Sequence, residues 1–211
     1  LVSGHNGNYL LFFPSYPYML QAHRAFTSVC PELTTIIQVP EMSEADRLAF
    51  LQRFDAENRE TLVGFAVMGG IFGEGIDLVG ERLSGAAVVG VGLPGISLER
   101  ELIRAHFDQY LNAGFEFAYM LPGLSRVLQA AGRVIRTEND RGVLLLIDRR
   151  FGTTRYRSLL PREWATIPTA GGEGLRRRLS EFWDRREPAG KEIRLQSQPE
   201  SRSKFILARK V

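Results

Sequence analysis

Two arginines three residues apart are the side chains in this sequence best suited to chemistry on a phosphate. They belong to the stretch Gln-Ala-Ala-Gly-Arg-Val-Ile-Arg, in which helical spacing puts Gln129, Arg133 and Arg136 on one side. Guanidinium groups are permanently charged planar forks that match phosphate oxygens, and the glycine before the first arginine lets a ligand approach closely. By spacing alone, a solvated basic helix face paired with Glu138 or Asp140 is the commoner interpretation.

A glycine-rich segment between two apolar runs is the second candidate. It contains Phe-Gly-Glu-Gly-Ile-Asp, and its glycines leave backbone N–H groups able to form an anion-binding nest. We expect ligand contacts from Gly73, Glu74, Gly75 and Asp77. The two acids are suited to positioning a water, contacting a nucleotide or orienting the arginines, and the sequence does not divide these roles between them. A glycine-rich loop without a ligand is the alternative.

A third candidate follows the first apolar run, in the order Phe-Phe-Pro-Ser-Tyr-Pro-Tyr. Ser15 is predicted to begin a helix, where its hydroxyl and the free N–H groups can hold a backbone phosphate. Tyr16 and Tyr18 can stack on bases. The alternative is an N-cap serine followed by core aromatics.

Several classes of site are excluded by the sequence. It has no Gly-x-x-x-x-Gly-Lys-Ser/Thr phosphate loop, no Asp-Glu-x-His box and no Gly-x-Ser-x-Gly elbow. Three scattered histidines and a single cysteine, Cys30, predict no metal site, disulfide or iron–sulfur cluster in this chain. Gly90-Val-Gly-Leu-Pro-Gly95 formally matches a dinucleotide fingerprint, but Pro94 removes a donor and no acidic strand end follows.

Short apolar runs alternate with amphipathic stretches, which predicts an α/β domain with a mainly parallel sheet. The expected strands are 9–13, 34–39, 62–68, 86–91 and 143–147, with a further short strand at 156–160. The expected helices are 18–29, one from a Ser43 cap to about residue 54, one from a Ser97 cap, 115–136 with an interruption near Pro122-Gly123, and 174–186. Because ligands bind beyond the carboxyl ends of parallel strands, we expect the candidate segments to meet at one sheet edge.

The basic charge of the chain is concentrated near its end. The net charge is +3, and residues 176–211 alone hold 11 Lys/Arg against 5 Asp/Glu. We expect one folded domain over residues 1–187 and a polar basic tail over 188–211, which either contacts nucleic acid or is solvated. No apolar run is long enough to span a membrane, no signal peptide is recognised, and a reducing cytoplasm is the expected location. Because the chain begins without methionine, we expect it to be a piece of a longer protein.

Together and in this order, the three segments resemble motifs of the DinG-like and xeroderma-pigmentosum-group-D-like superfamily 2 DNA helicases. The resemblance rests on Pro-Ser-Tyr, Glu-Gly-Ile-Asp and Gln-Ala-Ala-Gly-Arg-x-Ile-Arg-x-x-x-Asp-x-Gly, and it extends over about residues 7–183. It implies the second RecA-like domain of such a helicase, a three-layer α/β fold with helices on both faces of the sheet. It further implies that Arg133 and Arg136 act as arginine fingers on the γ-phosphate of ATP, with Gln129 beside the nucleotide.

The resemblance also implies partners for this chain. In the family a first RecA-like domain holds ATP with Mg²⁺ and often an iron–sulfur cluster, and the two domains ratchet along single-stranded DNA, typically 5′ to 3′. We therefore expect the isolated chain to be an inactive monomer that works with that first domain. Asp148-Arg-Arg150 matches the family's Asp-x-Arg, which either orients the finger helix or forms a structural salt bridge. The alternative function is a non-catalytic nucleic-acid-binding or regulatory module of the same fold.

Overall fold

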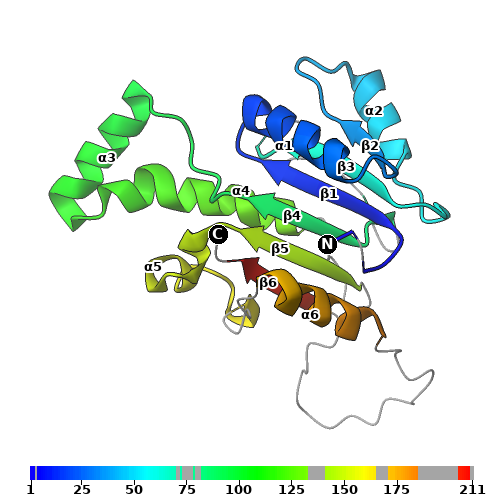
Figure 1. The fold of residues 1–211 in the computed structure, drawn as a ribbon. Coiled ribbons are helices and arrows are strands. Elements are labelled where there is room, and N and C mark those ends of the chain that lie inside the picture. Colours follow the sequence, from blue (N-terminus) through cyan, green and yellow to red (C-terminus); the bar gives the residue numbers. More distant parts are fainter. Residues whose placement is uncertain are drawn as a thin grey trace, which may run out of the picture.

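A six-stranded parallel sheet organises the part of the chain that the structure describes (Figure 1). The computed structural model describes residues 1–2, 4–69, 72, 78, 82–132, 141–164, 171–184 and 204–209. The strand order is β2-β3-β1-β4-β5-β6. The strands are β1 (Asn8–Phe13), β2 (Thr34–Ile37), β3 (Leu62–Val67), β4 (Gly85–Val89), β5 (Gly142–Ile147) and β6 (Lys204–Arg209).

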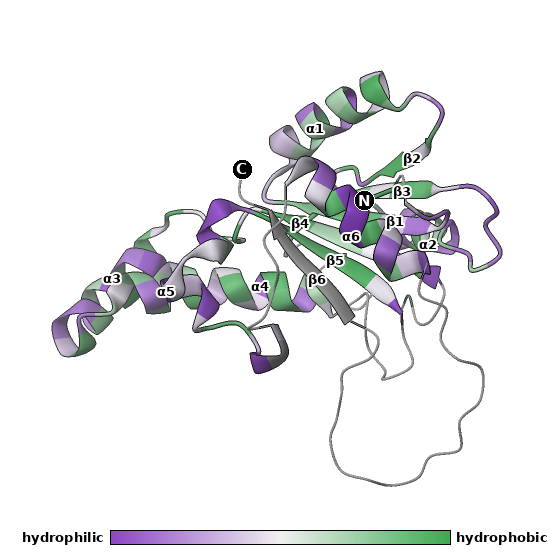
Figure 2. Ribbon diagram, turned by 60° about the horizontal axis from the view of Figure 1, so that its bottom comes forward, coloured by the Kyte–Doolittle hydropathy of each residue, from purple (hydrophilic) through white to green (hydrophobic). Residues whose placement is uncertain are grey.

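The central strands are apolar on both faces, as a sheet covered on both sides requires. In β1, Leu10 and Phe12 belong to one core cluster, whereas Tyr9 and Phe13 belong to a second cluster on the opposite face. This alternation follows from the two-residue repeat of a strand. In Figure 2 the central strands are coloured mostly as hydrophobic, as expected for a sheet covered on both faces.

Helices cover both faces of the sheet. The helices α1 (Tyr16–Val29) and α6 (Gly172–Asp184) pack on the face that carries Phe65 and Leu145. The helices α2 (Glu44–Gln52) and α4 (Leu121–Ala131) pack on the face that carries the largest cluster (Figure 1). This arrangement confirms the predicted three-layer α/β fold.

Serine residues cap the N-termini of three helices, as the sequence predicts. The hydroxyl of Ser43 accepts the Asp46 N–H at 3.1 Å, and the Asp46 carboxylate accepts the Ser43 N–H at 3.2 Å, which completes a capping box. Ser15 caps α1, and Ser97 caps α3 (Leu98–Leu111). Each cap satisfies an N–H group that the helix itself cannot bond.

A helical arm stands away from the sheet (Figure 1). It consists of α3, in which no residue is buried, and the π-helix η2 (Glu116–Met120), which continues directly into α4. The predicted interruption near Pro122-Gly123 is therefore wrong. The Leu121 N–H donates to the Glu116 carbonyl, five residues back, so the helix widens by one residue before the proline and does not break.

The short strand predicted at 156–160 is also wrong. Residues Thr154–Arg157 form the helix α5, between the 3₁₀ turns η3 (Arg149–Gly152) and η4 (Arg162–Trp164). Tyr156 and Leu160 are both buried in the largest core cluster. Their spacing of four suits one face of a helical turn, whereas a strand would have brought the intervening Ser158 to the same face.

The last strand was not expected from the sequence. The region 188–211 is predicted to be a polar tail, yet Lys204–Arg209 forms β6 and pairs in parallel with β5. The boundary proposed at residue 187 itself stays a prediction. Among the described residues, no helix combines the length and apolar character needed to cross a bilayer.

The end of α6 is fixed near the entry of β5. The Trp183 and His5 rings stack with centroids 4.0 Å apart, and the Arg141 guanidinium donates to the carbonyls of Phe182 and Trp183 at the end of the helix. A cation at a helix C-terminus is favourable because the carbonyls there carry partial negative charge. Burial, aided by the nearby Arg141 charge, lowers the pKa of His5. This cluster therefore fixes the point at which the chain re-enters the sheet.

Candidate functional site

Three neighbouring strands, β3, β1 and β4, end at the carboxyl edge of the sheet. Two predicted segments begin there, after β1 and after β3, and the Gly90–Gly95 sequence follows β4. The Met68 N–H donates to the Phe13 carbonyl at 2.8 Å, so the ends of β1 and β3 stay paired up to the point where both strands stop. The Gly90 N–H donates to the Ile147 carbonyl at 3.0 Å, which joins the end of β4 to the end of β5. The edge is therefore a continuous, hydrogen-bonded rim.

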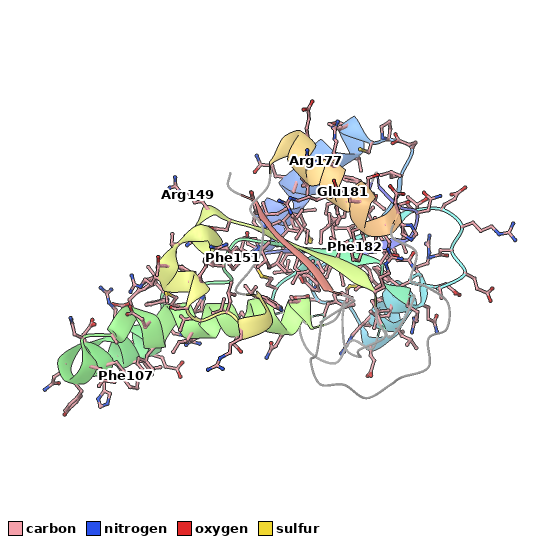
Figure 3. The ribbon with its side chains drawn as sticks, turned by 90° about the horizontal axis from the view of Figure 1, so that it is seen from below. Phe107, Arg149, Phe151, Arg177, Glu181 and Phe182 are labelled. Carbon is pink, nitrogen blue, oxygen red and sulfur yellow. The ribbon has the colours of Figure 1, made fainter. Side chains whose placement is uncertain are left out.

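An open groove of about 680 Å³ lies on this rim. Its lining consists of Pro14, Tyr18, Val89, Gly90, Ile147, Asp148, Arg149 and Arg150. Tyr18 projects from the first turn of α1 and is 47% exposed. Arg149 extends outward from η3, whereas the neighbouring Phe151 is turned into the core (Figure 3). An exposed aromatic ring and a cation in one groove can contact a base and a phosphate together.

The two tyrosines of the first segment differ in environment. The Tyr16 hydroxyl accepts a hydrogen bond from the buried Gln38 side-chain amide at 2.8 Å, and the side-chain oxygen Oε1 of Gln38 accepts the Val67 N–H at 2.8 Å. Burial raises the pKa of Tyr16. Tyr16 thus ties the start of α1 to the end of β3, while Tyr18 keeps its ring exposed. The exposed Ser15 lies beside them as the cap of α1.

Asp148 and Arg150 form a two-pronged ion pair at the end of β5. The Arg150 Nε and Nη2 atoms donate to the two Asp148 carboxylate oxygens at 3.0 and 2.7 Å, and the Arg150 N–H also donates to Asp148 Oδ1. Burial raises the pKa of Asp148, but these hydrogen bonds outweigh it and hold that pKa below its ordinary value. The pair fixes η3 to the strand end, which favours the structural interpretation of the Asp-x-Arg sequence.

Arg149, between these two residues, was not among the predicted site residues. Within the described part of the chain, no ion pair involves it. The signal in the sequence was the pair of adjacent arginines after Asp148, of which Arg150 forms the described ion pair with that carboxylate.

The arginine segment, which begins at Gln129, does not start at the same edge. Because β4 and β5 are parallel, α4 must run from the carboxyl edge back to the amino edge, where β5 begins. The start of α4 is at the carboxyl edge, where Gly123 lies against Gly92, and Gln129 lies exposed two residues before the end of the helix. Arg133 and Arg136 lie outside the described residues. The expectation that all the segments share one edge is therefore wrong for the chain that enters β5.

The glycine-rich segment is described only at its anchors. Gly73, Glu74, Gly75 and Asp77 lie outside the described residues. On either side of them, Phe72 and Leu78 are 0% and 2% exposed and belong to the largest core cluster. The Phe72 ring contacts the Phe50 ring, with centroids 4.5 Å apart. Buried apolar side chains thus flank these four residues on both sides, and one of them, Phe72, packs against α2.

Comparison with known proteins identifies this arrangement. The family described as "Helicase C-terminal domain" matches residues 1–167, which include all three segments of the resemblance. The chain belongs to this family. The match covers most of the chain, and it confirms the predicted membership of the DinG-like and xeroderma-pigmentosum-group-D-like helicases.

Relatives of this helicase domain agree with that assignment. The "Regulator of telomere elongation helicase 1 homolog" of Aedes aegypti is 32% identical over 171 residues, which cover 73% of this chain and 17% of that protein. The "General transcription and DNA repair factor IIH helicase subunit XPD/RAD3" of Saccharomyces cerevisiae is 26% identical over 163 residues, covering 72% of this chain and 20% of that protein. The chain thus spans about a fifth of the length of these relatives.

A solved structure of apo XPD shares the fold. It superimposes with a TM-score of 0.57 at 24% identity, covering 72% of this chain and 30% of that one. A second XPD helicase structure gives a TM-score of 0.53 at 25% identity, covering 72% of this chain and 26% of that one.

The Gly-x-Gly-x-x-Gly sequence of this helicase domain has a packing explanation. Gly92 has a φ of +65°, and a Cβ there would lie 2.6 Å from the Gly123 carbonyl oxygen. Gly123 in turn has no room for a Cβ against the Val91 carbonyl oxygen, at 2.7 Å. These glycines allow α4 to cross the strand end closely. Among the described residues, no group of three or more His, Cys, Asp or Glu side chains is arranged to hold a metal ion.

Proposed function

We propose that this chain is the second motor domain of an ATP-dependent DNA helicase, and that it completes an ATP site begun on another domain of the same polypeptide. The observation that carries the proposal is the family match over residues 1–167, which spans the three motifs of the resemblance. The chain has no phosphate loop of its own, so it needs a partner domain to hold the triphosphate.

The finger role belongs to Arg133 and Arg136, with Gln129 beside the nucleotide. In phosphoryl transfer, charge develops on the equatorial oxygens of the moving group, and fixed guanidinium groups stabilise that charge. Supplying them from a second domain couples turnover to domain closure, because the site is complete only when the two domains meet. Gly73, Glu74, Gly75 and Asp77 contribute backbone N–H groups and carboxylates to the same nucleotide.

The other domain supplies the remaining parts. Mg²⁺ bound with ATP neutralises charge on the phosphates, and its acidic ligands belong to the first domain, as does any iron–sulfur cluster. The present chain contributes orientation and charge. Closure on ATP and opening after hydrolysis then move the two domains along single-stranded DNA, in the 5′ to 3′ direction.

The DNA-binding role belongs to the rim of the sheet. Ser15, at the N-terminus of α1, is suited to a backbone phosphate, and the exposed Tyr18 ring is suited to a base. Tyr16 contributes mainly by fixing the start of α1 through Gln38. The groove that Tyr18 and Arg149 line gives the DNA strand a path across the domain.

The test replaces each finger in the full-length protein, as Arg133→Ala and Arg136→Ala. Loss of a charge contact made in the transition state should lower ATP turnover on the order of 10³-fold. Affinity for single-stranded DNA and the melting temperature should stay at the wild-type level. Arg24→Ala on the exposed side of α1 is the matched control and should leave turnover unchanged. Near-normal turnover in both finger variants would remove the assignment.

A further inference from the structure

Arg126 lies across two glycines at the carboxyl edge of the sheet. It projects from α4 over Gly69, which follows β3 and has a φ of +71°. A Cβ on Gly69 would lie 3.0 Å from Arg126 Nε and 3.1 Å from its Cδ, so the guanidinium stem rests directly on that peptide. The same guanidinium group donates from Nη1 to the Gly92 carbonyl oxygen at 3.5 Å.

Among the described residues, the Arg126 guanidinium forms a single hydrogen bond. It carries five N–H donors, and the one bond just described is long and goes to a neutral carbonyl. Among the described residues, no carboxylate forms an ion pair with it. The side chain is half-buried, so its charge is partly removed from water. A cation in that position is stabilised by an anion brought to it.

The place of Arg126 on the rim indicates which anion. Phe13 pairs with Val67 across β1 and β3, and Ser15 and Gly69 each lie two residues beyond that pair. The start of α1 is therefore next to the strand end on which Arg126 rests. Arg126 also precedes Gln129 by three residues, so the two lie on one side of α4. Phosphate oxygens match both a guanidinium fork and a helix N-terminus.

We propose that Arg126 is a phosphate-binding residue at this rim, additional to the two finger arginines. The inference rests on the proposed helicase function, which supplies two sources of phosphate, namely the backbone of single-stranded DNA and the nucleotide. Gly69 leaves room for this side chain, because a Cβ there would lie 3.0 Å from Arg126 Nε.

The test uses Arg126→Gln in the full-length protein. Arg59→Gln removes the same charge from an exposed site before β3, at the opposite edge of the sheet, and is the control. Fluorescence anisotropy with a labelled oligo(dT), repeated over a range of salt concentrations, measures DNA binding. A fluorescent ATP analogue measures nucleotide binding.

If the phosphate belongs to DNA, Arg126→Gln should weaken oligo(dT) binding about tenfold and reduce the salt slope by roughly 0.7, with nucleotide binding unchanged. If it belongs to the nucleotide, only the analogue should bind about tenfold more weakly. Arg126→Lys, which keeps the charge, should recover part of the affected affinity in either case.

Two results would overturn the assignment. One is that Arg126→Gln matches Arg59→Gln in both assays. The other is that both affinities fall together with the melting temperature and Arg126→Lys recovers neither, since that is the behaviour of a packing residue. A wild-type protein that binds neither ligand would refute the proposed function itself, which separates the two failures.

Discussion

Tyr16 and Tyr18 are the same residue type two positions apart, and the structure gives them different environments. Tyr16 is held by a hydrogen-bond chain through Gln38 to the backbone of Val67, whereas Tyr18 is 47% exposed beside the groove. The sequence predicted Ser15 as a helix cap because the hydroxyl residue and the following pattern are local signals. It could not separate the two rings, since the partner of Tyr16 lies 22 residues away. Arg126 was missed because a single arginine on a helix carries no motif.

Tyr18→Ala should weaken binding of single-stranded DNA by the full-length protein about tenfold, because stacking on one base is lost. Tyr110→Ala on the helical arm is the matched control, since that ring is also exposed, at 67%, and lies far from the groove. Anisotropy titration at one fixed salt concentration checks both variants. Equal affinities for the two variants would remove Tyr18 from the DNA path.

At the scale of elements, the sequence predicted the features that depend on local signals and missed those that depend on tertiary contacts. The Ser43 cap and the buried strand β1 depend on local signals, and the sequence predicted both. The π-helix before Pro122 and the strand β6 depend on distant parts of the chain. Lys204–Arg209 becomes a strand only because β5 offers an edge to pair with. A short apolar run between charged residues does not by itself predict this pairing.

The crossing of α4 over the end of β4 makes Gly92 the most restricted glycine of the site. Gly92→Ala should lower the free energy of unfolding by about 2–4 kcal/mol, because the methyl group meets the Gly123 carbonyl and φ is positive. Gly95→Ala is the control, since a Cβ there has nothing within 4 Å. Urea unfolding of both variants measures the difference. If Gly92→Ala proves as stable as Gly95→Ala, the close crossing is not a constraint.

At the scale of the whole molecule, the sheet determines what this chain can offer. Its carboxyl edge carries a groove, an exposed tyrosine and two arginines, Arg126 and Arg149. The sequence predicted an α/β domain with a parallel sheet, because apolar runs alternate with amphipathic stretches. It wrongly placed the segment before β5 at the carboxyl edge. The order of elements along the sequence does not show that the helix between two parallel strands returns to the opposite edge of the sheet. The chain spans about a fifth of the length of these relatives, and the ATP site that we propose requires a second domain.

ATP turnover in the presence of single-stranded DNA, compared between the isolated chain and the full-length protein, tests the account most directly. The account predicts DNA-stimulated turnover in the full-length protein and none above background in the isolated chain, with circular dichroism showing the chain folded. Robust turnover by the isolated chain would contradict the claim that its nucleotide site is completed by a second domain. A full-length protein that binds DNA without any turnover would leave the non-catalytic module as the correct interpretation.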